Sequence, residues 1–393
     1  MTLRVAMIGY GFMGAAHSVG WRQAPRVFDL PEAVELAVVV GRNEEAVAHA
    51  AEKWGWAEYA TDWREVIARD DIDLVDIVTP GDSHAEIAIA ALEAGKHVLC
   101  EKPLANTVEE AEAMAAAAER AAERGVRAMV GFTYRRVPAV TLLRDLIAEG
   151  RIGRVQQVRA AYRQDWLVDP EMPLAWRLQK EHAGSGALGD IGAHIVDMTQ
   201  FVTGQSVEAV SGILDTIVKR RPLQASGSGL AGEAGEGYGD VTVDDLAIFT
   251  GRLTDGALVS FEATRFATGR KNALSIEVSG TLGALRFDLE DLNVLKFYDR
   301  TDRAELQGFT TILVTEPVHP YVAGWWPAGH MLGYEHGFVH QVVDLVGAIA
   351  EGTDPHPTFA EGLSVQRVLA AVEASSENQS SWVRVAADAA VAV

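Results

Sequence analysis

Two residues that can exchange a proton with a hydroxyl group stand four positions apart in the glycine-rich stretch 184–194. They are Asp190 and His194, and the residues from about 191 to 202 have the apolar spacing of a helix. On a helix, a spacing of four puts the carboxylate and the imidazole on one face. An imidazole is well matched to taking a proton near neutral pH, so His194 suits general-base chemistry. A helix-capping aspartate followed by a structural histidine is the alternative interpretation.

A second chemical motif, G-x-G-x-x-G, lies at residues 9–14. It follows a short apolar segment, residues 3–8, and precedes a helical segment, which is the strand–turn–helix context that a dinucleotide-binding loop requires. Glycines permit the turn and the close approach of a pyrophosphate, whose charge then faces a helix N-terminus. A plain glycine turn is the alternative. The predicted cofactor contacts in this loop are Gly9, Gly11, Phe12, Met13 and Gly14.

The elements that position these residues begin with alternating strand and helix patterns up to about residue 136. Such repeats indicate an α/β fold of the Rossmann type, with a doubly wound parallel sheet. Predicted strands cover residues 3–8, 34–40, 74–78, 97–100 and 127–130, and predicted helices cover 43–54, 83–94 and a stretch opened by a capping box at 107–110. Ligands bind at the carboxyl ends of such strands. We therefore expect the polar residues found there to meet beside the glycine loop: Thr79, Pro80, His84, Glu101, Lys102 and the segment 132–136.

The position after the second strand bears on the choice of nicotinamide cofactor. Enzymes that use NAD often carry Asp or Glu there to hold the ribose hydroxyls. This chain has Gly41, followed by Arg42. Without a carboxylate a 2′-phosphate is not repelled, and a guanidinium can bind it. These two residues slightly favour NADP.

After about residue 137 the pattern changes to alternating strand-type segments. They predict a C-terminal α+β domain with an open, mostly antiparallel sheet. The strand-type segments are 155–164, 207–218, 243–253, 257–263, 273–278 and 285–289; helices are expected at 139–149, 334–350 and 361–377, a last strand at 382–385, and long loops at 224–240 and 315–333. We predict two domains: residues 1–136 bind the dinucleotide and residues 137–393 bind the substrate.

Three motifs, in this order, resemble those of the Gfo/Idh/MocA family, which includes glucose–fructose oxidoreductases and inositol dehydrogenases. The motifs are residues 9–14, residues 94–103 (AGKHVLCEKP) and residues 189–194 (GDIGAH). Within the family, residues 162–166 and 175–180, the latter leading to 184–190, are similar to those of levoglucosan dehydrogenases. The resemblance covers essentially the whole chain.

The resemblance implies hydride transfer between nicotinamide and a carbinol of a neutral cyclic sugar or polyol, levoglucosan- or inositol-like. By motif position Lys102, Asp190 and His194 take the catalytic roles. His194 would be the base, Lys102 would stabilise alkoxide charge, and Asp190 would hold a second hydroxyl or bias the histidine. The Lys102–Pro103 bond is commonly cis in the family. The resemblance also implies a homodimer or homotetramer built on the open sheet, and its levoglucosan-like part favours NAD.

Two other activities share this fold. One is an NAD-dependent glycosidase that acts by transient oxidation, and the other is a non-catalytic NAD(P)-binding regulator, which would be expected to lack the lysine or the histidine. Aromatic faces suit sugar rings, so a sugar site is expected to be lined by Trp166, Trp176 and Arg177, with ordinary packing as the alternative. His336 and His340 are four apart but have no evident third ligand, so no metal is predicted. Cys100 is expected to be a small buried side chain rather than a nucleophile.

Composition excludes several partner classes. The net charge of −21 over 393 residues argues against nucleic acid or an anionic membrane as partner. Along the sequence near the Asp190 stretch, no cluster of arginine and lysine is visible beyond Arg177 and Lys180, which argues against a phosphorylated substrate. The single cysteine permits no intrachain disulfide and suits a reducing compartment. No signal peptide or membrane-length apolar run is visible, so a cytoplasmic protein is expected.

Overall fold

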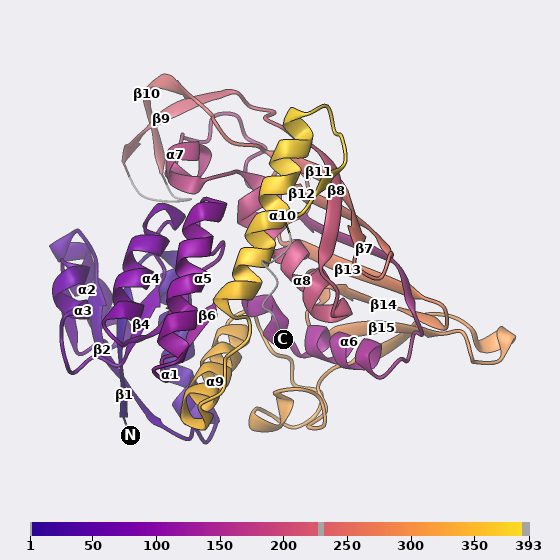
Figure 1. The fold of residues 1–393 in the computed structure, drawn as a ribbon, viewed down its shortest axis with the longest axis horizontal. Helices are drawn as coiled ribbons and strands as arrows, with labels where there is room; N and C mark the ends of the chain where they lie inside the picture. Colours follow the sequence, from indigo (N-terminus) through magenta and orange to yellow (C-terminus); the bar gives the residue numbers. More distant parts are fainter. Residues whose placement is uncertain (1, 227–231, 387–393) are drawn as a thin grey trace. The chain divides into compact units, whose positions relative to one another are not determined.

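The computed structural model describes residues 2–226 and 232–386, which form two compact units (Figure 1). The first unit contains Met1–Arg136 and Gly333–Leu363, and the second contains Val137–Leu332 and Ser364–Val393. The predicted domains, 1–136 and 137–393, differ from these units chiefly at Gly333–Leu363. Within the described part of the chain, no helix combines the length and apolar character needed to cross a membrane.

The first unit is built on a six-stranded sheet, and all its strands are parallel, as predicted. Its strand order is β3-β2-β1-β4-β5-β6, and the strands are β1 (Thr2–Ile8), β2 (Ala33–Val40), β3 (Glu58–Ala60), β4 (Leu74–Ile77), β5 (His97–Cys100) and β6 (Ala128–Val130). The order reverses between β1→β2 and β4→β5. Right-handed connections therefore place helices on both faces of the sheet, which confirms the doubly wound fold. The three-residue edge strand β3 was not predicted.

Helices cover this sheet, and one of them comes from the C-terminal half of the chain. They are α1 (Phe12–Val27), α2 (Glu44–Trp54), α3 (Trp63–Ile67), α4 (His84–Glu93), α5 (Val108–Ala122) and α9 (His336–Glu351). The predicted capping box opens α5, because Thr107 Oγ1 accepts from Glu110 N at 3.2 Å and Glu110 Oε2 accepts from Thr107 N at 3.1 Å. A Cβ on Gly20 of α1 would lie 2.8 Å from Phe338 O. This close approach of α1 and α9 explains why Gly333–Leu363 packs with the first unit.

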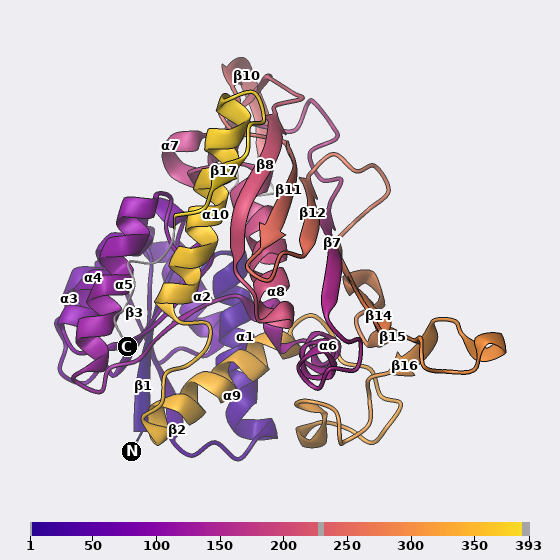
Figure 2. The ribbon, with the colours of Figure 1, turned by 45° about the vertical axis from the view of Figure 1, so that its right-hand side comes forward.

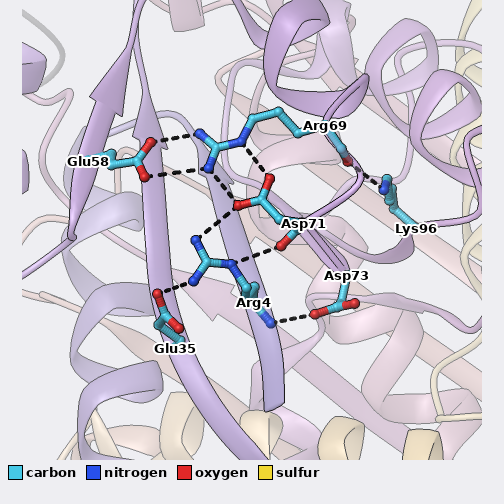
Figure 3. Close-up of polar contacts among 7 residues, drawn as sticks. All are labelled: Arg4, Glu35, Glu58, Arg69, Asp71, Asp73 and Lys96. Carbon is cyan, nitrogen blue, oxygen red and sulfur yellow. Dashed lines mark hydrogen bonds and ion pairs between the residues drawn. The ribbon is translucent and has the colours of Figure 1, made fainter. Parts of the chain in front are cut away.

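Ion pairs tie together the amino-terminal ends of the parallel strands (Figure 3). Arg69 bonds Glu58 at 2.7 Å and Asp71 at 2.8 Å, and Lys96 Nζ donates to Arg69 O at 2.7 Å. Hydrogen bonds to Arg69 hold the pKa of both carboxyl groups below its ordinary value. The whole network comprises Arg4, Glu35, Glu58, Arg69, Asp71, Asp73 and Lys96. It lies at the edge opposite the carboxyl strand ends, so it belongs to the scaffold.

The second unit contains a nine-stranded sheet in the order β16-β15-β14-β13-β7-β12-β11-β8-β17. All neighbours pair antiparallel except β7 and β12, which confirms the mostly antiparallel sheet. The strands are β7 (Val155–Arg163), β8 (Val207–Asp215), β11 (Leu246–Leu253), β12 (Leu258–Thr264), β13 (Ala273–Gly280), β14 (Gly283–Asp288), β15 (Val294–Asp299), β16 (Thr310–Leu313) and β17 (Val383–Arg384). Strands β15 and β16 were not predicted.

One face of the large sheet is covered and the other is open. Helices α6 (Pro138–Ala148) and α8 (Ala193–Thr203) pack against the covered face (Figure 2). Burial alternates along β11, as expected for a sheet with one face packed and one exposed. The open face carries the exposed side chains of Ile213, Ile248 and Leu258.

The prediction of an exposed loop at 224–240 was wrong. β9 (Arg220–Ser226) pairs antiparallel with β10 (Glu233–Asp240), and residues 227–231 lie outside the described residues. Glycine and serine make this segment a poor strand by composition. The buried Arg221 anchors β9 instead, because its guanidinium donates to the backbone oxygens of Leu167 and Asp169, both at 2.7 Å.

Candidate active site

The glycine loop after β1 contains glycines that the packing of the protein requires and one glycine that it does not require. Gly9 has a φ of +112°, and a Cβ there would lie 2.9 Å from Val78 O. A Cβ on Gly14 would lie 2.8 Å from Gly9 O, so both positions are fixed by the fold itself. Gly11 caps α1 and has no atom within 4 Å of its ideal Cβ position. Packing within the protein does not require glycine at Gly11, and the open space there fits the close approach of a pyrophosphate to the helix N-terminus.

Phe12 and Met13 follow in the first turn of α1. The Phe12 side chain is exposed, and its ring stacks on Tyr334 with ring centroids 6.5 Å apart. Tyr334 also packs edge-on against Tyr134, again at 6.5 Å. This aromatic group could not be predicted from the sequence, because Tyr334 is far from the loop along the chain and only the packing of α9 brings it there.

The other predicted cofactor residues follow β4 and β5, which are neighbours in the sheet. His84, at the start of α4, is buried and faces two backbone oxygens, with Nε2 at 2.9 Å from Thr79 O and Nδ1 at 3.1 Å from Pro103 O. The imidazole therefore joins the loop at Thr79 and Pro80 to the loop that carries Lys102. The Lys102–Pro103 peptide bond is cis.

A buried charged cluster stands behind Lys102, and Glu101 is the one member that was among the predicted site residues. His17 of α1 lies with Nδ1 at 2.9 Å from Asp76 Oδ2 and Nε2 at 2.9 Å from Glu101 Oε1. Trp21 Nε1 donates to the same Asp76 oxygen at 2.7 Å. Burial alone would lower the pKa of His17, but the two carboxylates outweigh it and raise the pKa to about 10. Glu101 Oε2 also accepts from Lys102 N at 3.2 Å, so the cluster fixes the backbone that carries the lysine.

Packing gives a second reason why Gly41, the position after β2, carries no carboxylate; the first was a preference for NADP. A Cβ on Gly41 would lie 2.0 Å from Cε1 of Tyr10, so the tyrosine ring occupies the space of a side chain there. Arg42 is exposed and makes no hydrogen bond or ion pair with any residue in 2–226 or 232–386. Its guanidinium is therefore available to a phosphate.

In the second unit, Asp190 lies in a π-helical turn, Leu188–Gly192, that runs directly into α8. The helical run thus begins earlier than the predicted residue 191. Asp244 holds its start, because Oδ1 accepts from Gly186 N and Oδ2 from Leu188 N, both at 2.7 Å. A Cβ on Gly186 would lie only 1.7 Å from Asp244 O, so close backbone packing explains this glycine. The Asp190 side chain remains 30% exposed.

His194, in the first turn of α8, is half-buried beside an aromatic and amide network. Its ring centroid is 5.8 Å from that of Tyr162. Asn272 Oδ1 accepts from Tyr162 Oη at 2.7 Å and from Gln164 Nε2 at 2.8 Å. Gln164 Oε1 in turn accepts from Trp166 Nε1 at 2.9 Å. This network holds Trp166 and the ring next to His194 in one connected set of side chains.

The remaining sequence candidates are placed as follows. Trp176 and Arg177 are half-buried in a short turn, Trp176–Leu178, with the guanidinium 4.4 Å from the Trp176 ring centroid. His336 Nδ1 accepts from Gly333 N at 2.9 Å, and buried His340 has Nδ1 at 2.9 Å from Arg136 O. No group of three or more His, Cys, Asp or Glu suited to a metal occurs in the described part of the chain. Cys100 is buried, and burial raises the pKa of its thiol.

A parallel sheet with an open glycine position at the N-terminus of α1 defines a dinucleotide-binding protein of the Rossmann class. Residues 3–132 match the model of a protein family described as "Oxidoreductase family, NAD-binding Rossmann fold". Residues 140–286 match the model described as "GFO/IDH/MocA C-terminal domain". The chain belongs to the Gfo/Idh/MocA family of oxidoreductases, which confirms the resemblance drawn from the three motifs.

Individual relatives match over nearly the full length. Levoglucosan dehydrogenase of Pseudarthrobacter phenanthrenivorans is 43% identical over 388 residues, which is 98% of either chain. An oxidoreductase domain protein from Kribbella flavida is 64% identical, with a TM-score of 0.94 over 98% of this chain and 100% of that one. A levoglucosan dehydrogenase in complex with NADH and levoglucosan is 42% identical, with a TM-score of 0.91 over 98% and 100% of the respective chains.

Proposed function

We propose that this chain is an NAD(P)-dependent dehydrogenase that transfers a hydride between nicotinamide and a carbinol of a neutral cyclic sugar or polyol. One observation carries the proposal most strongly. Over 98% of its length the chain matches a levoglucosan dehydrogenase whose structure holds NADH and levoglucosan. Levoglucosan is therefore the first candidate substrate, and inositols are the second.

The cofactor residues follow from the first unit. When bound, NAD(P) supplies the hydride acceptor or donor. The open backbone at Gly11 and the helix N-terminus behind it fit a pyrophosphate. Arg42, exposed beside Gly41, would bind a 2′-phosphate and so admit NADP. The full set of proposed cofactor residues is Gly9, Gly11, Phe12, Met13, Gly14, Arg42, Thr79, Pro80, His84, Glu101 and Lys102.

The catalytic roles are assigned to Lys102, Asp190 and His194. His194 removes the hydroxyl proton of the carbinol during oxidation. Lys102, on a backbone that Glu101 and His17 hold in place, stabilises the charge that develops on the substrate oxygen. Asp190 accepts a hydrogen bond from a neighbouring substrate hydroxyl.

Substrate binding and assembly belong to residues 137–393, and dinucleotide binding to residues 1–136. Trp166 and Trp176 offer ring faces to the C–H groups of a sugar, and Arg177 lies over Trp176. The open sheet face with Ile213, Ile248 and Leu258 is proposed to pair subunits into a homodimer or homotetramer. We place the protein in the cytoplasm.

A cofactor-reduction screen tests the function. The purified protein is incubated with NAD⁺ or NADP⁺ and with levoglucosan, inositols, common aldoses and an aldose phosphate. Saturable reduction with a neutral sugar or polyol is the expected result, and faster turnover of the aldose phosphate than of its parent sugar would contradict the substrate class. An aryl glycoside added in parallel identifies the glycosidase alternative, since that enzyme would release the aglycone without net reduction of cofactor. Cofactor binding without turnover of any compound would indicate a regulator.

A further inference from the structure

Arg265, directly after β12, is a buried cation with unused hydrogen-bonding capacity. Its side chain is 0% exposed, and its Nε, Nη1 and Nη2 have no hydrogen-bond partner among the residues that the structure describes. The guanidinium lies 5.5 Å from the Trp166 ring centroid. Its Nε lies 3.8 Å from Asp190 Oδ2. A buried charge is costly unless it is paired and hydrogen-bonded. The burial of a guanidinium that makes no hydrogen bond and lies at 3.8 Å from one carboxylate therefore needs an explanation.

Arg221, another buried arginine of the same unit, shows what a purely structural role looks like. Its Nη1 and Nη2 donate to backbone oxygens of Asp169 and Leu167 at 2.7 Å, and these bonds hold β9 against the segment that follows β7. Arg265 makes no such backbone bonds through its side chain. Packing of the chain therefore accounts for Arg221 but leaves the guanidinium of Arg265 unexplained.

Three carboxylates interact electrostatically with Arg265, and two of them already accept hydrogen bonds from backbone N–H groups. Asp244 accepts from Gly186 N and Leu188 N, and Asp245 Oδ2 accepts from Ile217 N at 2.8 Å and Val218 N at 3.1 Å. Burial raises the pKa of both carboxyl groups, while Arg265 acts to lower it. Asp190 differs from them, because its carboxylate is partly exposed and lies within ion-pair distance of the guanidinium.

We propose that Arg265 is a positioning residue for Asp190: from the buried side it fixes the place and the charge of the carboxylate that receives substrate hydroxyls on its exposed side. Since Arg265 is fully buried, it does not touch the substrate itself. The same guanidinium lies near the Trp166 ring, so one buried cation supports both a carboxylate for hydroxyl groups and an aromatic face for C–H groups. This inference rests on the proposed function, because the kinetic role of Asp190 does.

Kinetics of Arg265→Gln separates this role from a structural one. We expect the KM for the sugar to rise roughly 10- to 100-fold, with a smaller change in kcat and an unchanged Kd for the reduced cofactor, since an interaction made before the transition state acts mainly on KM. Arg265→Lys keeps the positive charge, so its KM should rise less than that of Arg265→Gln. Arg221→Gln is the matched control, because it removes a buried arginine whose side-chain hydrogen bonds go to backbone oxygens and whose charge acts on Asp245 and Asp169 rather than on Asp190. It should leave the KM within about twofold of the wild type.

A double-mutant comparison tests the pairing directly. In an Asp190→Asn background, Arg265→Gln should change the KM by less than about twofold, because the partner it positions is already gone. The same fold increase in both backgrounds would overturn the proposal. So would an equal KM increase in Arg221→Gln.

Thermal unfolding of the full chain without ligands tests the pairing independently of catalysis. Asp190→Asn should lower the Tm when Arg265 is present and leave it nearly unchanged in an Arg265→Met background. Additive shifts would overturn the pairing even if the protein is an active dehydrogenase. If no substrate is turned over, the proposed function fails while this cycle still decides the pairing. If the Arg265→Gln and Arg265→Met proteins do not fold, Asp190→Asn alone decides, because an unchanged Tm contradicts a pair that compensates a buried charge.

Discussion

Replacement of His17 by glutamine should give the largest and most characteristic loss of stability in the first unit. The imidazolium stands between Asp76 and Glu101, each 2.9 Å away and all buried. Removing the central cation leaves two carboxylates facing each other across an uncharged amide. Breaking a buried ion pair by removing one partner typically costs about 3–5 kcal/mol.

The same two carboxylates also make the contribution of His17 to stability depend on pH. The pKa of His17 rises from 6.5 to about 10, because attraction to Asp76 and Glu101 outweighs the burial that would lower it. At roughly 1.4 kcal/mol per unit, this rise corresponds to about 5 kcal/mol. The folded state binds the proton more tightly than the unfolded state, so the contribution is complete below pH 6.5 and is lost as the pH rises through about 10.

The assay is denaturant unfolding of wild type and His17→Gln across this pH range. The difference in unfolding free energy should be largest near pH 6 and should shrink towards pH 10. His340→Gln is the matched control, since His340 is also a buried histidine but burial lowers its pKa to about 3. The wild type therefore loses stability through His340 only as the pH falls from 6.5 towards 3, and the difference between wild type and this control should stay flat above neutral pH. A flat difference for His17→Gln as well would refute a charged His17.

Four further predictions concern catalysis, cofactor choice and assembly. His194→Ala should lower kcat by roughly 10²–10⁴-fold, the usual scale for general-base catalysis, and should remove the acid limb of the rate profile; a near-native kcat would exclude it as the base. Lys102→Ala should cost a similar factor with an unchanged cofactor Kd, and Lys102→Arg should not recover it, because a planar guanidinium does not replace a compact ammonium; full recovery would contradict a point-charge role. Arg42→Ala should lower kcat/KM for NADP while sparing NAD, and an equal loss with both would remove Arg42 from the 2′-phosphate site. Ile248→Glu should dissociate the proposed oligomer in light scattering, whereas an unchanged mass would place the interface elsewhere.

Features that depend on local spacing could be predicted from the sequence. The glycine loop, the capping box at Thr107 and the parallel strands all follow from short patterns and are confirmed. The hairpin of β9 and β10 could not be predicted, because its glycine and serine content is typical of a loop. The hydrogen bonds by which Arg221 anchors β9 go to backbone oxygens that are distant along the chain. Likewise, nothing local shows that α9 packs against Gly20 of α1.

In the candidate site, too, residues in local motifs could be selected as candidates from the sequence, whereas contacts between residues distant along the chain could not be predicted. Asp190, His194 and Lys102 stand in recognisable motifs, so their residue types and neighbours were sufficient to select them. The groups that hold them are separated along the chain, as with His17, which is 59 residues from Asp76 and 84 from Glu101. The sequence signals for that cluster were Glu101, in the motif at residues 94–103, and Asp76, a charged residue within the apolar strand β4. No sequence signal marked Arg265, because its proposed positioning role depends on Asp190 lying beside it in space.

Isotope transfer tests the central claim most directly. Levoglucosan carrying deuterium at its carbinol carbons is incubated with the protein and oxidised cofactor, and the products are analysed by mass spectrometry and NMR. We expect one deuterium at C4 of the nicotinamide for each ketone formed, with the anhydro ring intact and with transfer strongly reduced in His194→Ala and Lys102→Ala. Reduced cofactor without deuterium, or ring opening without net reduction of the cofactor, would contradict hydride transfer from a sugar carbinol.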